Sequence, residues 1–248
     1  MRLTHTLTVL AGAAVCTFAG VAGADEIGMT GRIRDFMTSH PDMEYELSGD
    51  VDKGIVQDLI GGDGKPVYAG GQGISTNGEE YFDQWYNDTN GVNMGADLEL
   101  ILDNTINANP HIYTYKNLDF WPVDNQMFGN EGNPHNQHFT FELHTTGTYF
   151  QGDVLRFKSD DDMFVFLGGW LFLDLGGVHK PQDGKIFMDD VAAFLGLNPG
   201  DSFDYDLFYA ERHTKLATLK FDVPIPAPGA GALFGLGACF LTMRRRRG

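Results

Sequence analysis

The chain has 248 residues, of which 34 are acidic and 17 basic, so its formal net charge is −17. Such a surface repels nucleic acid and anionic membranes, and it suits divalent cations or uncharged partners such as neutral glycans. The two cysteines, Cys16 and Cys239, both lie in end segments that we expect to be removed, which excludes disulfides, cysteine catalysis and thiolate metal sites from the remainder.

Residues 1–24 have the layout of a secretory signal peptide. Arg2 gives a positive start, an apolar stretch rich in Ala, Leu and Val follows, and small residues end the segment. We expect cleavage between Ala24 and Asp25 after export through the inner membrane. The alternative is a short anchoring helix, although about fifteen apolar residues are few for a membrane span.

Residues 25–223 are predicted to form one all-β domain. Apolar and polar residues alternate at 98–103, 139–144 and 217–223, as in strands that bury one face. Short apolar runs between turns extend the pattern, at 154–157, 163–167, 171–175 and 203–208. We expect an antiparallel sandwich or barrel, and of the two a lectin-like β-sandwich with jelly-roll or Greek-key character. Little helix is expected: residues 35–46 fit a short helix or strand, and 81–87 a helix.

Residues 224–248 have the pattern of a C-terminal sorting segment. The parts are a motif, Pro226-Ala227-Pro228, an apolar stretch, 229–243, and a basic end, Arg244, Arg245, Arg246 and Arg247. A short apolar segment before basic residues predicts a helix whose C-terminus stays in the cytoplasm. The segment resembles the PEP-CTERM sorting signal of Gram-negative bacteria, with a variant proline motif. The resemblance implies transient membrane contact, removal by an exosortase-type protease and release to an exopolysaccharide-rich surface; the alternative is a permanent tail anchor.

Three adjacent carboxylates, Asp160, Asp161 and Asp162, lie between two predicted strands. Adjacent carboxylates raise one another's pKa unless a cation or hydrogen-bond donors neutralise them. Calcium prefers clustered oxygen ligands of this kind. Asp174 ends the next strand and points either at the same cation or into the turn beside it. The alternative for the whole cluster is a polar turn that faces water.

The region 32–221 resembles the fibro-slime domain, a family of secreted surface proteins from bacteria and slime moulds. The strongest matching block is 159–169, which reads SDDDMFVFLGG. The matching blocks occur in order at residues 34–36, 40–44, 63–67, 84–88, 120–124, 128–130, 138–144, 159–169, 174–179 and 208–214.

The family in turn is similar to the protective-antigen-type β-sandwich superfamily, which includes yeast surface lectins. In those lectins two adjacent aspartates joined by a cis peptide hold calcium, and the ion coordinates sugar hydroxyls. The resemblance implies that Asp160 and Asp161 hold calcium here. The lectins take further ligands, an asparagine among them, from a later loop, where this chain has Glu211-Arg212-His213. Glu211 is therefore the expected ligand from that loop.

Four further residues are candidates for contact with a bound ligand, namely Trp170, His179, Arg212 and His213. For Arg212 we favour the alternative of a buried ion pair with one of the strand-end aspartates. For Trp170 the alternative is a place in the core, which is the commoner position of large aromatic side chains in a sandwich.

The leading functional prediction is a non-enzymatic protein of the cell surface or extracellular matrix. It would bind carbohydrate in a calcium-dependent way, in adhesion or in an exopolysaccharide-rich biofilm. One alternative is a structural matrix protein with a stabilising calcium site. Another is a secreted polysaccharide hydrolase, although no Gly-x-Ser-x-Gly, HExxH or phosphate-loop motif is present.

Overall fold

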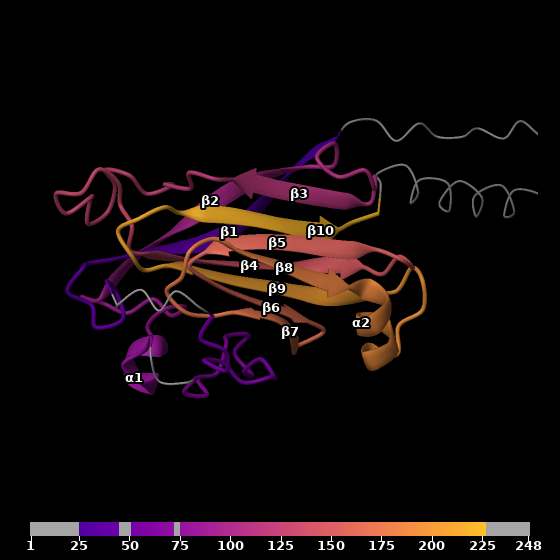
Figure 1. The fold of residues 1–248 in the computed structure, drawn as a ribbon, viewed down its shortest axis with the longest axis horizontal. Coiled ribbons are helices and arrows are strands. Elements are labelled where there is room, and N and C mark those ends of the chain that lie inside the picture. The colour runs from indigo at the N-terminus through magenta and orange to yellow at the C-terminus, as the bar shows by residue number, and fades with distance from the viewer. Residues whose placement is uncertain (1–24, 45–50, 72–74, 227–248) are drawn as a thin grey trace, which may run out of the picture.

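The computed structural model describes residues 25–44, 51–71 and 75–226 (Figure 1). The predicted signal segment, 1–24, and all of the sorting segment beyond Pro226 lie outside the described residues, as do both predicted terminal helices. Within the described ranges, no helix is long and apolar enough to cross a membrane.

Ten strands of the described chain form one sheet in which every pairing is antiparallel. The order across the sheet is β7-β6-β9-β4-β1-β2-β3-β10-β5-β8. The helices are α1 (Glu79–Phe82) and α2 (Met188–Leu195). The prediction of an antiparallel all-β fold with little helix is confirmed. The strands are β1 (Glu26–Phe36), β2 (Asn93–Asp103), β3 (Ile112–Asn117), β4 (Phe139–Thr148), β5 (Val154–Asp160), β6 (Asp162–Leu167), β7 (Trp170–Leu175), β8 (Gln182–Phe187), β9 (Ser202–Glu211) and β10 (Thr218–Pro224).

The sheet curls around one apolar core to which all ten strands contribute. Its two edge strands approach each other at Gly184 of β8, where an added Cβ would lie 2.6 Å from Leu173 Cδ1 of β7. Only glycine permits this approach, because the side chain of β7 fills the space that a Cβ would need. The described strands thus form one continuous, near-closed antiparallel sheet that encloses a sandwich-like core.

Strand β1 is central to the sheet, between β2 and β4, yet the sequence indicates a short helix or strand only from residue 35 onward, which overlaps just the last residues of β1. Its sequence, EIGMTGRIRDF, has two glycines and three charged residues near its end, which hide the alternation. Gly31 has a packing role, because a Cβ there would lie 2.5 Å from the Phe141 ring of β4. Strands β3 and β8 were also missed, and α1 ends at Phe82, so the predicted helix over 81–87 is wrong for most of its length.

The segment between β1 and β2 packs on the outer face of β6 and β9 and builds a second apolar cluster there. Trp85 and Tyr86 from this segment are fully buried, with the Tyr86 ring 4.9 Å from that of Phe208 on β9. Lys65 from the same segment pairs with Glu142 of β4 at 2.5 Å. These contacts fix the segment against the end of the sheet where the acidic cluster lies.

Beside the second apolar cluster, His144 of β4 lies 2.7 Å from the Asp206 carboxylate of β9. The hydrogen bond to Asp206, and next the one to Glu142, raises the pKa of His144 to about 9. A raised histidine pKa stabilises the fold fully below the unfolded value of about 6.5, and this contribution disappears as the pH rises through the folded value.

We therefore expect the stability difference between the wild type and His144→Gln to be constant below about pH 6.5 and to shrink as the pH approaches 9. Urea unfolding across this pH range measures the free energy of unfolding of both proteins. Subtracting one value from the other at each pH cancels the contributions of the other titrating groups. A difference that grew with pH would contradict the assignment.

Candidate functional site

The acidic cluster lies where β5 ends and β6 begins, at the left-hand end of the sheet in Figure 1. Asp160 is the last residue of β5, Asp162 is the first of β6, and Asp161 joins them. The peptide bond between Asp160 and Asp161 is cis. Glu211 ends β9, the strand that pairs with β6, so strand register brings it to the same corner.

Arg212 forms a fully buried ion pair with Asp162. Its Nε and Nη2 donate to the two carboxylate oxygens of Asp162 at 2.7 and 3.0 Å. The amide of Gly177 donates a further hydrogen bond to Asp162 at 2.6 Å. The sequence prediction that Arg212 pairs with a strand-end aspartate is therefore confirmed, and Asp162 has its charge balanced without a metal.

The remaining donors of Arg212 hold loops together. Its Nη1 donates to the carbonyl oxygens of Ser75 and Asp42 at 2.5 and 3.2 Å, and its guanidinium lies over the Trp85 ring at 4.5 Å. The backbone carbonyl of Arg212 accepts a hydrogen bond from the amide of Glu44. One side chain thus ties the end of β9 to the loop after β1 and to the segment that covers β6.

Asp160, Asp161 and Glu211 form a group of buried carboxylates beside this ion pair. Burial raises the pKa of Asp160 to about 7. Burial and the neighbouring carboxylates also hold the pKa values of Asp161 and Glu211 well above their usual range.

The atoms around this group supply hydrogen bonds but little positive charge. Asp161 accepts from the amides of His179 and Arg212, at 2.9 and 3.1 Å, and Glu211 accepts from the Tyr209 hydroxyl at 3.1 Å. The nearest cation, Arg212, already neutralises Asp162. If Asp160, Asp161 or Glu211 ionises, its negative charge is therefore in excess of the positive charge that the described residues place in this corner.

The three carboxylates are hard oxygen donors from two strand ends, which is the ligand chemistry that calcium prefers. They fit calcium in kind and in charge. In the part of the chain that the structure describes, no group of three or more Asp, Glu, His or Cys side chains is already arranged around a common metal position.

The other predicted site residues lie in different surroundings. Asp174 accepts hydrogen bonds from the amides of Gly54 and Gly176, so it caps the turn after β7. His179 is fully buried, and its ring nitrogens face the carbonyl oxygens of Lys180 and Leu175.

Two further candidates remain partly exposed. His213 follows the site directly and is half-buried; its Nδ1 is buried and has no hydrogen-bond partner in the described structure. Trp170 begins β7 at the other end of β6, where it packs edge-on against Phe194. The fold therefore keeps His213 near the acidic group and separates Trp170 from it.

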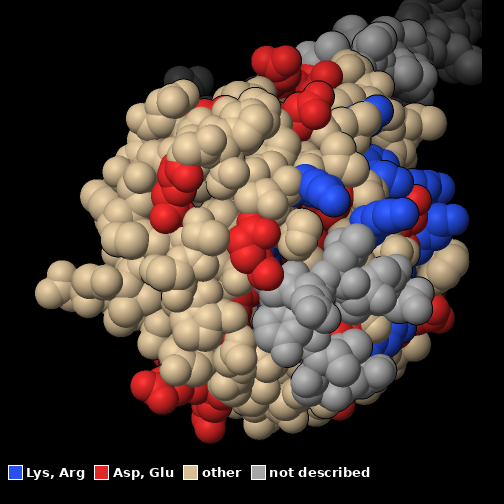
Figure 2. Space-filling view, turned by 60° about the vertical axis from the view of Figure 1, so that its left-hand side comes forward, with Lys and Arg blue, Asp and Glu red and all other residues tan. Residues whose placement is uncertain are grey.

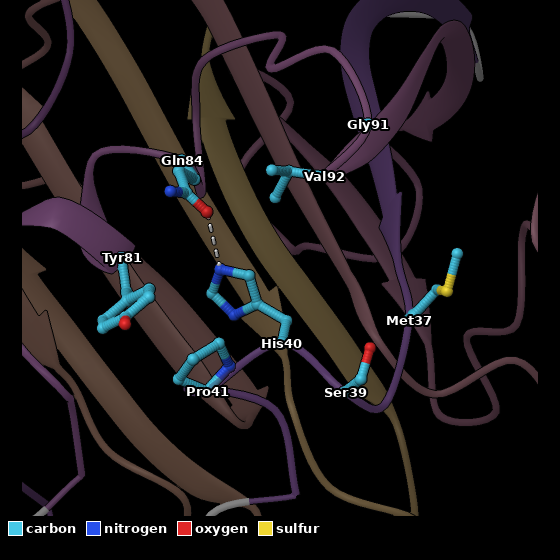
Figure 3. Close-up of a pocket in the computed structure, with 8 residues that line it drawn as sticks. All are labelled: Met37, Ser39, His40, Pro41, Tyr81, Gln84, Gly91 and Val92. Atoms are coloured by element: carbon cyan, nitrogen blue, oxygen red, sulfur yellow. Dashed lines mark hydrogen bonds between the residues drawn. The ribbon is translucent and has the colours of Figure 1, made fainter.

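A pocket of about 260 Å³ adjoins the site through the loop after β1 (Figure 3). His40 lies at its centre, where its Nε2 is 3.1 Å from Gln84 Oε1 and its Nδ1 accepts from the amide of Asp42. Tyr81 forms one wall. The complete lining, which contains no Asp, Glu, Lys or Arg, is Met37, Ser39, His40, Pro41, Tyr81, Gln84, Gly91 and Val92.

Sequence reasoning did not single out this pocket. Its signal was present in the blocks 40–44 and 84–88, which carry the family resemblance but are 40 residues apart. An aromatic wall with neutral hydrogen-bonding groups suits a small uncharged molecule with both apolar and hydroxyl faces.

Several curated proteins of Dictyostelium discoideum are similar to this chain. Protein psiR is 34% identical over 201 residues, which cover 75% of this chain and 20% of psiR. Protein psiC is 34% identical over 197 residues, which cover 73% of this chain and 37% of psiC. Protein psiD is 34% identical over 212 residues, covering 79% and 41%. The chain thus spans less than half the length of each of these relatives.

No protein-family model matches the chain. Among solved structures, a PA14 sugar-binding domain from an RTX adhesin gives 8% identity and a TM-score of 0.29 over 77% of this chain and 87% of that domain. A β-glucosidase from Kluyveromyces marxianus gives 11% identity and a TM-score of 0.32 over 73% of this chain and 20% of the enzyme. At these TM-scores neither likeness carries an argument about fold or function.

Replacing Arg212 tests the role of the buried ion pair. We expect Arg212→Met to lower the free energy of unfolding by about 3–5 kcal/mol, because it leaves the Asp162 charge buried without a partner. The exposed Arg156→Met should change it by less than about 0.5 kcal/mol. Denaturant unfolding measures both variants.

Restoring charge balance in the double variant Asp162→Asn/Arg212→Met should recover part of the loss, because no buried charge then remains unpaired. A double variant as unstable as the sum of the two single variants would show that the pair does not act as a unit.

Proposed function

We propose that this chain is an exported, non-enzymatic, calcium-dependent carbohydrate-binding module of the cell surface or extracellular matrix. The observation that carries the proposal is the group of buried carboxylates, Asp160, Asp161 and Glu211, which form no ion pair with a Lys or Arg side chain among the described residues. The ordered blocks that resemble the fibro-slime domain support the same conclusion, and they span most of the described residues.

Asp160, Asp161 and Glu211 would hold the ion. Bound calcium would neutralise the three carboxylates and leave coordination positions for backbone oxygens, water or sugar hydroxyls. The chain's own groups prepare the corner, because the amides of His179 and Arg212 orient Asp161. The Tyr209 hydroxyl is within hydrogen-bond reach of both Glu211 and the backbone carbonyl of Asp160, and it donates its one proton to one of them at a time. The Arg212–Asp162 pair keeps these loops in place.

The carbohydrate would contact the half-buried His213 beside the acidic group and the neutral pocket around Tyr81 and Gln84. Aromatic faces and amide groups are suited to the apolar and hydroxyl faces of a sugar ring. Arg212 and His179 are fully buried, so they position loops and do not touch the sugar.

A second candidate is a structural matrix protein whose calcium only stabilises the fold. The burial of Arg212 and His179 favours it, because two expected ligand contacts are withdrawn from the surface.

The sequence patterns at the two ends of the chain add to the proposal. We propose cleavage after Ala24, retention through the segment 224–248 and processing there by an exosortase-type protease. The processed protein would associate with an exopolysaccharide or biofilm matrix. An adhesive role follows from the same set of features.

Calcium titration of the full chain tests the central step. At a free calcium concentration about 100 times the dissociation constant, binding should stabilise the fold by about 2.7 kcal/mol, a rise in Tm of roughly 5–10 °C for a domain of this size. Asp160→Asn/Asp161→Asn should lose both the calorimetric signal and the shift. Chelator should reverse the shift in the wild type.

Asp58→Asn/Asp119→Asn removes two exposed carboxylates elsewhere and should respond to calcium like the wild type. A glycan screen with calcium and with chelator, repeated on Tyr81→Ala, then separates the two candidates. Stabilisation by calcium without any glycan signal would favour the structural protein. No response of the wild type to millimolar calcium would refute the proposal.

A further inference from the structure

Five basic side chains gather on the outer face of strands β3, β10, β5 and β8. Strand register places Lys220 of β10 directly opposite Lys116 of β3 on one side and Lys158 of β5 on the other. In the next row Arg156 of β5 is opposite Lys185 of β8. We call the five residues Lys116, Arg156, Lys158, Lys185 and Lys220 the basic face.

The alternation of these strands directs the five side chains outward. The neighbours in the chain, among them Leu155, Phe157, Ile186 and Leu219, are buried in the main core. Lys116, Arg156 and Lys185 are exposed, and Lys158 and Lys220 are partly exposed. Successive side chains point to opposite faces of a strand, so the basic residues share the outer face.

Figure 2 shows how uneven the charge distribution is. Lys and Arg side chains gather on the right of this view with some Asp and Glu side chains among them, whereas Asp and Glu side chains are scattered over the rest of the visible face. The chain as a whole carries twice as many acidic as basic residues. A concentration of cations on one face therefore runs against the composition of the protein.

Packing does not explain the basic face, because like charges directly opposite each other destabilise a sheet. Its neutralising groups are few. Lys158 pairs with the exposed Asp183 at 2.9 Å, and the buried Asp222 accepts a hydrogen bond from the Arg156 amide at 2.9 Å. An anion bound across the rows would relieve the repulsion that remains.

We propose that the basic face binds a single extended chain of an acidic polysaccharide, one that carries carboxylate or sulfate groups. Neighbouring strands are about 4.8 Å apart, so Lys116, Lys220 and Lys158 present three ammonium groups in a short line across the sheet. A single polyanionic chain can follow this line and avoid the acidic surface beside it. A nucleic acid duplex or a bilayer is wider, and its negative surface would also face the acidic side chains around the basic face.

Lys158 lies two residues before Asp160 on β5, but none of the five basic side chains is a proposed calcium ligand or lines the neutral pocket, so binding at the basic face needs neither of them. Its attraction is electrostatic between exposed groups, so it should weaken as salt screens the charges.

The test measures binding of the full chain to polygalacturonate and to dextran sulfate, at low ionic strength and with chelator present. We expect both polymers to bind, neutral dextran not to bind, and affinity to fall steadily with added salt. Lys116→Gln/Lys220→Gln should weaken binding roughly tenfold or more. The control Lys53→Gln/Lys215→Gln removes two exposed lysines outside the basic face and should bind like the wild type.

The variant Lys116→Gln/Lys220→Gln should have a melting temperature no lower than that of the wild type, because it loses like-charge repulsion. A second variant, Arg156→Gln/Lys185→Gln, should weaken polymer binding independently. Equal polymer affinity of Lys116→Gln/Lys220→Gln and of the control Lys53→Gln/Lys215→Gln would overturn the proposal. Tighter binding of the wild type to duplex DNA or to anionic phospholipid vesicles than to either polysaccharide would overturn it as well. Calcium-induced stabilisation measured on the same variants stays unchanged, so failure here is distinct from failure of the calcium site.

Discussion

The buried ion pair between Arg212 and Asp162 is the constraint on which the site depends. Its carboxylate stands at the start of β6 and its guanidinium follows the end of β9, so the pair joins two neighbouring strands at the same end of the sheet. The same guanidinium holds the loop after β1 and the segment that contains Ser75. A buried charge pair is stable only when its remaining donors and acceptors are satisfied, and here backbone carbonyls and the Trp85 ring complete the set.

Because this pair uses the arginine of the corner, the neighbouring carboxylates have hydrogen-bond donors but no Lys or Arg partner among the described residues. Burial and, for Asp161 and Glu211, the charge of the neighbouring carboxylates raise the pKa values of these three groups. Charge imbalance of this kind is unfavourable for folding alone. The proposed calcium ion would relieve this imbalance, and the amides of His179 and Arg212 already hold the Asp161 side chain in place.

Outside the core, the curled sheet separates charges that the composition would mix. The acidic group occupies one end of the sheet, the neutral pocket lies under the loop after β1, and the basic face spreads over four strands. The net charge of −17 argues against polyanionic partners only if charge is spread evenly. With the positive charges of Lys116, Lys158 and Lys220 in one row, the local field has the opposite sign to the average.

The sequence by itself determined the antiparallel all-β class and the positions of most strands, because apolar alternation is a local signal that burial of one strand face imposes. It also located the adjacent aspartates and the candidate partner Arg212. Only the tertiary structure decided that Asp162 takes the arginine, that β1 is a central strand despite its glycines and charges, and that His40 and Gln84 meet in one pocket. It likewise decided that Lys116, Lys158 and Lys220 stand side by side. These relations join residues far apart in the chain, and they are fixed by strand register and packing, which no local pattern of residues encodes.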